Sequence, residues 1–314
     1  MKRWLFTAAL AALAAPAASP AGYTLIAGSF APGRQPDGNT VFIDAPAGLI
    51  VVDTGRHPEH RAKILAYAKA RRRPVAAIVN SHWHLDHTGG NAALRAAFPR
   101  AALYASPAIE GALTGFLANS RRQAEAFLAS GRASPAQAEE MRGDFATMDA
   151  PAALRATVPV TQSRLRRVAG RLLHVNLARN AATAGDVWLY DEAAGAVVAG
   201  DLVVAAVPFL DTACPEGWRR ALADISRTRF RILYPGHGAP MTRAQFDRWR
   251  AAFGNLLDCS AAGSRGDAEC KAGWMRDAAA FVPRGEEGRV EGLLDYYLKT
   301  RLRSAAGRRE YCAE

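Results

Sequence analysis

One short segment constrains this chain more than any other. Residues 80–91 read Asn-Ser-His-Trp-His-Leu-Asp-His-Thr-Gly-Gly-Asn, which places three histidines and an aspartate within six positions. The apolar run at 75–80 is typical of a buried strand, and residues 91–98 are typical of a helix. Imidazole nitrogen and carboxylate oxygen are ligands that suit zinc. A strand end followed by four such side chains therefore predicts a metal site at the edge of a sheet.

Segments typical of strands and helices recur along the rest of the chain. Strands are predicted at 23–27, 40–44, 49–53, 75–80, 101–105, 164–168, 172–177, 187–190, 196–199 and 231–234. Helices are predicted at 58–70, 91–98, 218–227, 242–258 and 289–304. Groups of strands with helices before, between and after them favour a layered α/β sandwich over an all-β barrel.

An Ala-rich stretch, 106–150, interrupts this pattern and has no strand signal. It is predicted to form a helical insertion, a flap or side wall near the metal edge. Its apolar side chains favour packing against the body over a lid on the ligand; they are Ile109, Leu113, Phe116, Leu117, Phe127 and Leu128.

The first residues are typical of a secretory signal peptide, predicted to span 1–21. Lys2 and Arg3 precede an apolar stretch at 4–15, and small residues follow at 17–21. The apolar stretch is too short for a stable transmembrane anchor. We expect cleavage after Ala21, or alternatively after Ala17. The mature domain, 22–314, is then periplasmic or secreted, with no stable membrane insertion.

Four cysteines lie in the last third of the chain: Cys214, Cys259, Cys270 and Cys312. An even number in an exported chain favours disulfide bonds. Cys259 and Cys270 bracket a Gly/Ser/Asp-containing loop that a local bridge could close. Cys214 would then pair with Cys312 and tie a C-terminal extension, 255–314, to the body. A structural zinc site is the alternative, although no pair has the close spacing that such sites use.

The composition and the net charge limit the classes of partner that this chain is expected to bind. Half of the residues are hydrophobic and 22% are charged, an ordinary globular composition that excludes a disordered or coiled-coil chain. The net charge of +11 raises nucleic acid, anionic lipid and acidic substrates as partners. The cations are scattered, however, and only residues 71–73 form a basic run. We therefore expect a small-molecule substrate and no nucleic acid.

The segment at 80–91 resembles the His-x-His-x-Asp-His motif of the metallo-β-lactamase fold. Three other segments resemble motifs of the same family, in family order: Asp53-Thr54-Gly55, Ala199-Gly200-Asp201-Leu202 and Pro235-Gly236-His237-Gly238. The resemblance implies an αββα four-layer sandwich with its site at one edge of the two sheets. It also implies that the Asp53 carboxylate buttresses this site.

The resemblance divides the implied ligands into two sets. His82 and His84 belong to the first metal. Asp86, His87 and His237 belong to the second, and Asp201 is shared. The third histidine of the first set usually stands in a His-Thr-x-Gly-Asp sequence.

In this chain the corresponding residues are Ala182-Thr183-Ala184-Gly185-Asp186, so alanine replaces that ligand. His174 and Asn180 are the nearest polar residues that could compensate. Because the first set has lost an imidazole, we predict one tightly held Zn²⁺ and a second metal that is weak or absent. The tight ion is predicted at Asp86, His87, Asp201 and His237.

The function that follows is zinc-dependent hydrolysis by a metal-bound hydroxide. Asp86 is the first catalytic candidate, and His82 and His84 are candidates for general base or proton shuttle. Segments 181–188 and 197–218 are similar to exported family members described as quinoprotein relay system zinc metallohydrolases. That similarity implies a periplasmic redox enzyme as a partner. The alternatives are a β-lactamase and a non-catalytic, zinc-containing periplasmic binding or assembly partner.

Overall fold

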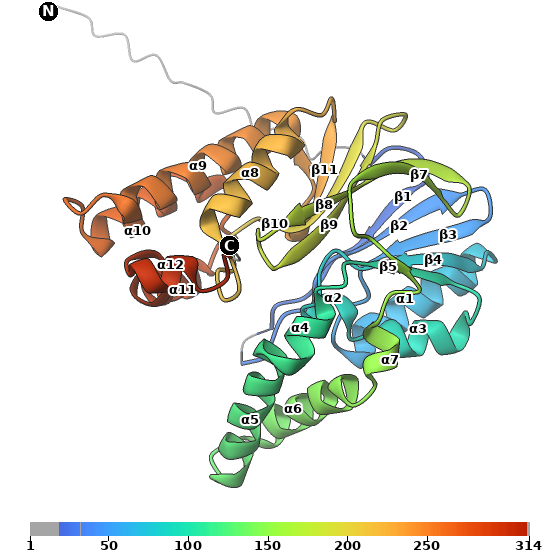
Figure 1. Cartoon of the computed structure of the whole chain (residues 1–314), viewed down its shortest axis with the longest axis horizontal. Helices are drawn as coiled ribbons and strands as arrows, with labels where there is room; N and C mark the ends of the chain where they lie inside the picture. The colour runs from blue at the N-terminus through green and yellow to red at the C-terminus, as the bar shows by residue number, and fades with distance from the viewer. Residues whose placement is uncertain (1–18, 32, 313–314) are drawn as a thin grey trace, which may run out of the picture.

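A computed structural model describes residues 19–31 and 33–312 (Figure 1). Up to residue 18, the predicted signal peptide lies outside the described residues. Within the described part, no helix is both long and apolar enough to cross a membrane. Two sheets face each other, and helices cover their outer faces, which gives the predicted four-layer αββα sandwich.

The first sheet has the strand order β1-β2-β3-β4-β5-β6. Its strands are β1 (Tyr23–Ile26), β2 (Thr40–Ala45), β3 (Gly48–Val52), β4 (Val75–Val79), β5 (Ala102–Ala105) and β6 (Val158–Pro159). The first three pair antiparallel, and the pairs from β3 to β6 are parallel. Parallel pairs need crossover connections, which α1 (Pro58–Arg71) and α3 (Asn91–Ala97) provide on the outer face. The short helix α2 (Leu85–Thr88) precedes α3.

The second sheet has the order β12-β11-β10-β9-β8-β7. Its strands are β7 (Arg164–Val168), β8 (Arg171–Arg179), β9 (Gly185–Asp191), β10 (Ala196–Val204), β11 (Ile232–His237) and β12 (Met241–Thr242). Only the β10–β11 pair is parallel, and its crossover is α8 (Pro215–Ser226). Helix α9 (Arg243–Ala261) lies beside α8 on the outer face of this sheet.

The strands near the centre of each sheet are buried on both faces. Every residue of β3, β9 and β10 is buried, which explains why β3 is a continuous apolar run and why only Gly and Asp interrupt the apolar residues of β9 and β10. Side chains from both sheets meet in one cluster, including Val41, Ile43, Ile50, Val175, Leu189 and Tyr234. This shared core fixes the two sheets against each other, so the loops at their common edge have rigid supports.

The predicted insertion is helical. It contains α4 (Ile109–Thr114), α5 (Phe116–Ala129) and α6 (Pro135–Met148), and α7 (Pro151–Leu154) follows it. Ser134 begins α6 with a capping box that includes Gln137. The α5–α6 hairpin projects from the body (Figure 1). Buried Ile109 of α4 and Leu117 of α5 belong to one apolar cluster with Trp83, whereas Phe127 and Leu128 are only partly buried.

The C-terminal region adds α10 (Asp267–Asp277), η1 (Ala279–Phe281), α11 (Glu287–Tyr297), η2 (Leu298–Leu302) and α12 (Ala305–Arg309). Both predicted disulfides are present, Cys214–Cys312 and Cys259–Cys270. Helix α9 continues through residue 255, where the extension was predicted to begin. Part of the expected loop between Cys259 and Cys270 is the first turn of α10.

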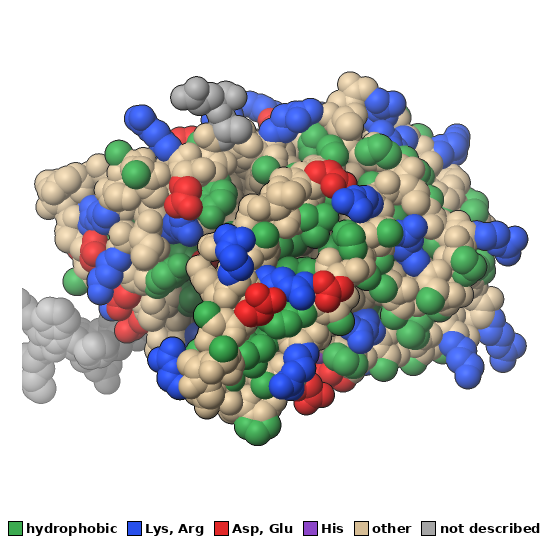
Figure 2. All heavy atoms as spheres, turned by 60° about the horizontal axis from the view of Figure 1, so that its bottom comes forward, with side chains coloured by type: hydrophobic (Ala, Val, Ile, Leu, Met, Phe, Trp, Pro, Cys, Tyr) green, Lys and Arg blue, Asp and Glu red, His purple; other side chains and the backbone are tan. Residues whose placement is uncertain are grey.

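Basic side chains do not gather on the face shown in Figure 2. Lys and Arg are spread there among acidic and hydrophobic side chains. Many described arginines pair with a neighbouring carboxylate, as Arg155 does with Glu110 at 2.8 Å. The basic balance of the chain therefore forms no concentrated patch on this face.

Candidate metal centre

The predicted metal-binding segment connects β4 to α2 at the edge between the two sheets. Strand β4 ends at Val79, so the segment leaves the sheet before its first histidine. Asn80 fixes the start of this loop: its side-chain amide donates to the carbonyl oxygen of His87 at 3.1 Å and accepts from the Asn91 amide at 2.7 Å. The same His87 carbonyl accepts from the backbone N–H of Thr54 at 2.8 Å. These bonds hold the histidines on a rigid support.

Asp86, His87, His237 and Asp201 bring four ligand atoms together. His87 Nε2 lies 3.3 Å from Asp86 Oδ2, 3.2 Å from Asp201 Oδ1 and 3.3 Å from His237 Nε2. His237 Nε2 lies 3.1 Å from Asp86 Oδ2 and 3.5 Å from Asp201 Oδ1. In a tetrahedral zinc site with bonds of about 2.0–2.2 Å, ligand atoms stand roughly 3.3–3.6 Å apart. This set fits one zinc ion.

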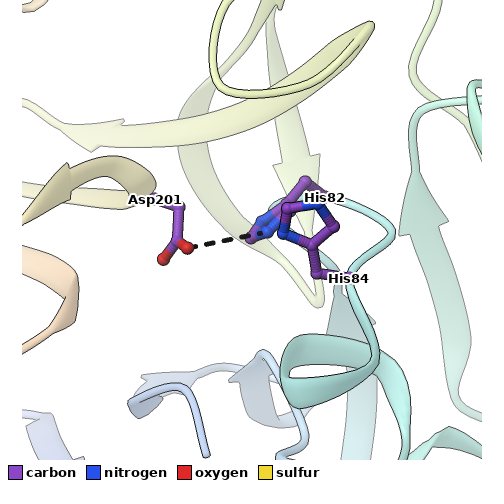
Figure 3. Close-up of side chains that lie close together, drawn as sticks. All are labelled: His82, His84 and Asp201. Atoms are coloured by element: carbon purple, nitrogen blue, oxygen red, sulfur yellow. Dashed lines mark ion pairs between the residues drawn. The ribbon is translucent and has the colours of Figure 1, made fainter. Parts of the chain in front are cut away.

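His82, His84 and Asp201 form the second possible metal-binding group (Figure 3). The two rings lie 4.5 Å apart between centroids, and His82 Nε2 is 3.8 Å from Asp201 Oδ2. Within the described residues, His82 Nε2 and both Asp201 oxygens are buried and have no hydrogen-bond partner. Buried polar atoms normally have partners, and a cation bound between the two groups would supply one.

The two carboxylates are held in their charged forms. Burial opposes ionisation of Asp86 and Asp201, but the nearby His87 and His237 outweigh it and hold both pKa values well below the usual range. Burial also disfavours the charged forms of the two histidines, yet the same carboxylates raise the pKa of His87 and bring that of His237 to about 9. The pocket therefore attracts positive charge, which a metal ion can supply in place of protons.

For His82 and His84, in contrast, the surroundings lower the pKa. Burial lowers the pKa of His82 and of His84, and neighbouring histidines lower it further. Both rings are accordingly neutral at pH 7, which is the form that binds a metal.

Asp53 lies directly beneath His87, as the family resemblance implied. Its carboxylate accepts from the Ser81 backbone N–H at 2.7 Å, from the Ser81 hydroxyl at 2.7 Å and from His87 Nδ1 at 2.8 Å. The backbone of Asp53 has φ +62°, a left-handed conformation that is uncommon outside glycine. The Nδ1–H bond to Asp53 leaves the His87 Nε2 lone pair for the metal.

Ser81 links Asp53 to His82 and so fixes which ring nitrogen of His82 carries the proton. Its hydroxyl donates its hydrogen to Asp53, so the hydroxyl oxygen can only accept from His82 Nδ1, 3.0 Å away. The proton of His82 is thereby placed on Nδ1, and Nε2 keeps the lone pair that faces Asp201.

Thr212 performs a comparable task for His84. Its hydroxyl donates to the carbonyl oxygen of Ala182 at 3.1 Å and lies 3.0 Å from His84 Nε2. A hydroxyl has only one hydrogen, so Nε2 of His84 must be the donor in that second contact. The lone pair of His84 is then on Nδ1, which is the ring atom available to a metal.

Gly200 and Gly236 both help to position the side chain of Asp201. Gly200 has φ +53° and lies between two register shifts of the β10–β11 ladder. Such bulges re-aim side chains near functional sites. At Gly236, an added Cβ would stand 1.9 Å from Asp201 Oδ1. The Gly-Asp and Gly-His segments therefore depend on each other sterically.

The structure does not bring His174 to this site. His174 lies in β8, where its ring stacks on Tyr190 with centroids 5.5 Å apart and stands 3.7 Å from Glu192. It does not replace the ligand missing at Ala182, which is itself buried. Asn180 adopts φ +49° in the turn before β9, and its backbone N–H donates to the Ala184 carbonyl.

The metal-ligand candidates open onto a cavity of about 490 Å³. His84 and Asp86 form part of its lining, together with residues of α5, α6 and α11. Trp83 also lines it, and its ring packs on those of His84 and Phe116, with centroids 4.5 and 5.4 Å apart. A substrate can therefore reach the metal-binding groups from one side.

Fold and site together define a metal-dependent hydrolase. The sequence profile of the metallo-beta-lactamase superfamily matches residues 33–239, and the chain belongs to this superfamily.

Three comparisons illustrate how distant its relatives are. A linear primary-alkylsulfatase of Pseudomonas sp. (strain ATCC 19151) is 47% identical over 49 residues, which cover 15% of this chain and 9% of that protein. A metallo-beta-lactamase family protein from Thermus thermophilus has a TM-score of 0.57 at 18% identity, covering 88% of this chain and 93% of its own. A stereoselective inverting sec-alkylsulfatase from Pseudomonas sp. has a TM-score of 0.54 at 18% identity, covering 88% and 47%.

The match to the curated relative spans less than a tenth of that protein's length. At 18% identity, the two solved structures share the fold with this chain. Substrate must therefore be argued from the residues of the site itself.

Proposed function

We propose that this chain is a zinc-dependent hydrolase of a small ester-type substrate, with six metal-binding residues divided between two sites: His82, His84, Asp86, His87, Asp201 and His237. The observation that carries this proposal is the close approach of four ligand atoms: His87 Nε2 and His237 Nε2 lie 3.3 Å apart, and each lies 3.1–3.5 Å from an oxygen of Asp86 and of Asp201. When bound, zinc polarises a substrate oxygen and lowers the pKa of a water ligand towards about 7.

We propose that one ion is held tightly and a second weakly. The tight set offers two imidazoles and two carboxylates, whose charges balance the ion. The other set offers two imidazoles and a share of Asp201, and in it His82 Nε2 and Asp201 Oδ2 are 3.8 Å apart. Ala182 contributes a methyl group where the family pattern has an imidazole.

Proton transfer is assigned to Asp86. Hydrolysis adds one water across the scissile bond: oxygen joins the acyl, phosphoryl or sulfuryl group, and a proton goes to the leaving oxygen. Asp86 lines the cavity, and its Oδ2 faces His87 and His237. Its other carboxylate oxygen is the atom that we expect to orient the water and pass on its proton. Where the second metal is absent, neutral His82 or His84 can take this proton instead.

We also propose an exported enzyme of the periplasm or outside the cell. Its two disulfide bonds support a compartment outside the cytoplasm. The segments at 181–188 and 197–218 support the quinoprotein-related group, with a periplasmic redox enzyme as partner.

The test combines metal analysis with a hydrolysis panel. Purified wild type should retain about one zinc per chain and hydrolyse at least one member of a panel of esters, thioesters, lactones, β-lactams, and sulfate and phosphate esters. The local similarity to an alkylsulfatase is the reason to include sulfate esters. Asp86→Ala should lose at least about a hundredfold in kcat, whereas Ala182→His should raise the zinc content towards two.

His174→Ala is the matched control, because this histidine lies outside both groups. It should change neither zinc content nor rate. A wild-type chain that binds no zinc even when zinc is supplied would contradict the proposal. So would an Asp86→Ala variant as active as wild type. Zinc retention without any turnover would instead favour the non-catalytic binding partner.

A further inference from the structure

The cavity beside the metal centre is lined mainly by apolar side chains. Aromatic and thioether groups from four parts of the chain face it: Phe30, Trp83, Phe116, Met141, Phe145 and Phe209. A pocket that binds sugars or peptides would present many hydrogen-bonding groups to its ligand. This lining instead offers surface that gains free energy when an apolar group displaces water.

The charged side chains of the same cavity already have partners. Arg56 pairs with Asp144 at 3.3 Å, and Arg121 pairs with Asp149 at 2.5 Å. Asp211 accepts the hydroxyl hydrogen of Tyr297 at 2.7 Å.

Glu140, another charged residue of this lining, accepts from the backbone N–H of Gln35 at 2.7 Å. Both lining arginines thus have a carboxylate partner, Asp144 for Arg56 and Asp149 for Arg121. A ligand group that enters the cavity beyond the metal centre meets no unpaired cation among the described residues. An uncharged group suits it best.

The walls of this cavity come from the additions to the sandwich. One wall is the α5–α6 hairpin, and another is α11, which supplies Leu293 and Tyr297. Helix α11 lies outside the segment that the superfamily profile matches. The Tyr297–Asp211 hydrogen bond holds this wall close to the loop before α8. At least the α11 wall of the cavity is therefore formed by residues beyond the segment that defines the superfamily.

We propose that the substrate of the metal centre carries an elongated, uncharged acyl or alkyl chain that lies in this cavity, with its ester group at His84 and Asp86. The inference rests on the proposed function, because it identifies the substrate of that same site. Two classes of compound carry such a carbon chain, carboxylic esters and alkyl sulfates, and both fit this proposal.

Binding tests the inference without requiring catalysis. Acetate and decanoate are titrated calorimetrically into the zinc-loaded full mature chain. Each fully buried methylene strengthens binding by up to about fourfold, so decanoate should bind at least about a hundredfold tighter than acetate. Equal affinities for the two acids would overturn the inference.

A pair of variants on one helix locates the binding. Ala124 of α5 lines the cavity, whereas Ala126 on the same helix is exposed and does not. Ala124→Trp should reduce the preference for decanoate at least tenfold and leave the zinc content unchanged. Ala126→Trp should match wild type. If Ala126→Trp weakens decanoate as much as Ala124→Trp does, the chain does not lie in this cavity.

Turnover then separates the inference from the function on which it rests. p-Nitrophenyl acetate, p-nitrophenyl decanoate and decyl sulfate are compared in wild type and Ala124→Trp. A higher kcat/KM for one of the long-chain compounds, lost in Ala124→Trp, supports both proposals and identifies the bond. Decanoate binding that depends on Ala124 without hydrolysis of any compound supports the apolar site and contradicts the hydrolase.

Discussion

The ring of His84 is joined to the backbone of Ala182 through one hydroxyl group. Thr212 Oγ1 lies 3.0 Å from His84 Nε2 and donates to the Ala182 carbonyl oxygen at 3.1 Å. In the family pattern, the residue at 182 is a histidine ligand. In this chain, residue 182 contributes through its backbone instead. The Ala182 carbonyl oxygen accepts the hydroxyl hydrogen of Thr212, and this orients the Thr212 oxygen that accepts from His84 Nε2. The first metal-binding group therefore lacks the third imidazole of the family pattern, but the ring of His84 still has a fixed orientation.

We predict that Thr212→Val weakens the second metal. Valine preserves the shape of threonine but cannot accept from Nε2–H, so the His84 ring loses its fixed tautomer. Loss of such a supporting bond typically costs 10–100-fold in metal affinity. Chelator competition measures the affinity, and ¹⁵N NMR of the imidazole reports the tautomer. Thr212→Ser should restore both.

Thr24→Val is the matched control for this substitution, because the hydroxyl of Thr24 in β1 bonds to Tyr67 of α1 and belongs to neither metal-binding group. Its metal affinity should equal that of wild type. An unchanged His84 tautomer in Thr212→Val would show that the hydroxyl does not orient the ring.

Asp53→Ala should damage both the metal centre and the fold. The buried carboxylate accepts three hydrogen bonds from Ser81 and His87, and its removal leaves buried donors without partners. We expect the free energy of unfolding to fall by about 2–4 kcal/mol, and zinc affinity to fall at least tenfold. Urea denaturation and chelator competition measure the two effects.

Asp53→Asn separates these effects. Asparagine tolerates the left-handed backbone and keeps one acceptor oxygen, so it should lose less stability than alanine. It should still weaken zinc, because the neutral amide no longer strengthens His87 as a ligand. If both variants retained zinc as wild type does, Asp53 would have no supporting role.

The pair formed by Asp37 and His57 predicts a pH optimum for stability. His57 Nδ1 lies 2.8 Å from Asp37 Oδ2, and both side chains are buried. Burial opposes ionisation of Asp37, but the bonds from His57 and Arg56 outweigh it and lower its pKa. Burial likewise opposes the charge on His57, and Asp37 overcomes it and raises the pKa of His57.

The two shifts act at opposite ends of the pH scale. The contribution of Asp37 is present above its unfolded pKa of about 3.9 and is lost as the pH falls through the lower folded value. The contribution of His57 is present below about 6.5 and is lost as the pH rises through the higher folded value. The pair should therefore stabilise the fold most between about pH 4 and 6.5.

Chemical denaturation at a series of pH values tests this window. Asp37→Asn should lower the free energy of unfolding at pH 6 by about 3 kcal/mol, since it leaves a buried partner unpaired. Asp44→Asn is the control, because its ion pair with Arg71 is partly exposed, and it should cost less than about 1 kcal/mol. A stability profile for Asp37→Asn parallel to that of wild type would contradict the assignment.

The two disulfides should differ in their effect on stability. Cys214–Cys312 closes 98 residues and Cys259–Cys270 closes 11. Loop-closure entropy predicts losses of about 5 and about 3 kcal/mol, respectively. The double variants Cys214→Ser/Cys312→Ser and Cys259→Ser/Cys270→Ser, compared by urea denaturation, give the order. Equal losses would mean that loop closure does not govern the difference.

Much of this fold follows from local sequence. The apolar runs that became β2, β3, β4 and β10 have few rival interpretations, because both faces of each strand are mostly buried. The two-residue strands β6 and β12 carry no such signal, since a pair of residues shows no periodicity. The sequence predicts a loop at the start of α10 because Gly263, Ser264 and Gly266 precede it.

The site was predictable only where its residues form a motif. The ligand candidates lie in short segments that can be recognised one by one. Thr212 and Ser81 could not be recognised in this way. Thr212 is 128 positions from His84 in the chain, and a lone threonine carries no metal signal. The contact depends on how the loop before α8 meets the segment after β4 in the folded chain, and no local sequence pattern encodes that meeting.

The bond between Cys214 and Cys312 lies near one wall of the cavity beside the metal centre, since Asp211, three residues before Cys214, accepts the hydrogen bond from Tyr297 of α11. Among the metal-ligand candidates, His237 alone lies in the loop of 98 residues that this disulfide closes, and strand β11 of the second sheet holds it in place. Protein made in a reducing cytosol should therefore still assemble its metal centre while its α11 wall is loosely held. Such a preparation would hydrolyse short and long substrates with little discrimination, so a selectivity assay on reduced material would misrepresent the oxidised enzyme.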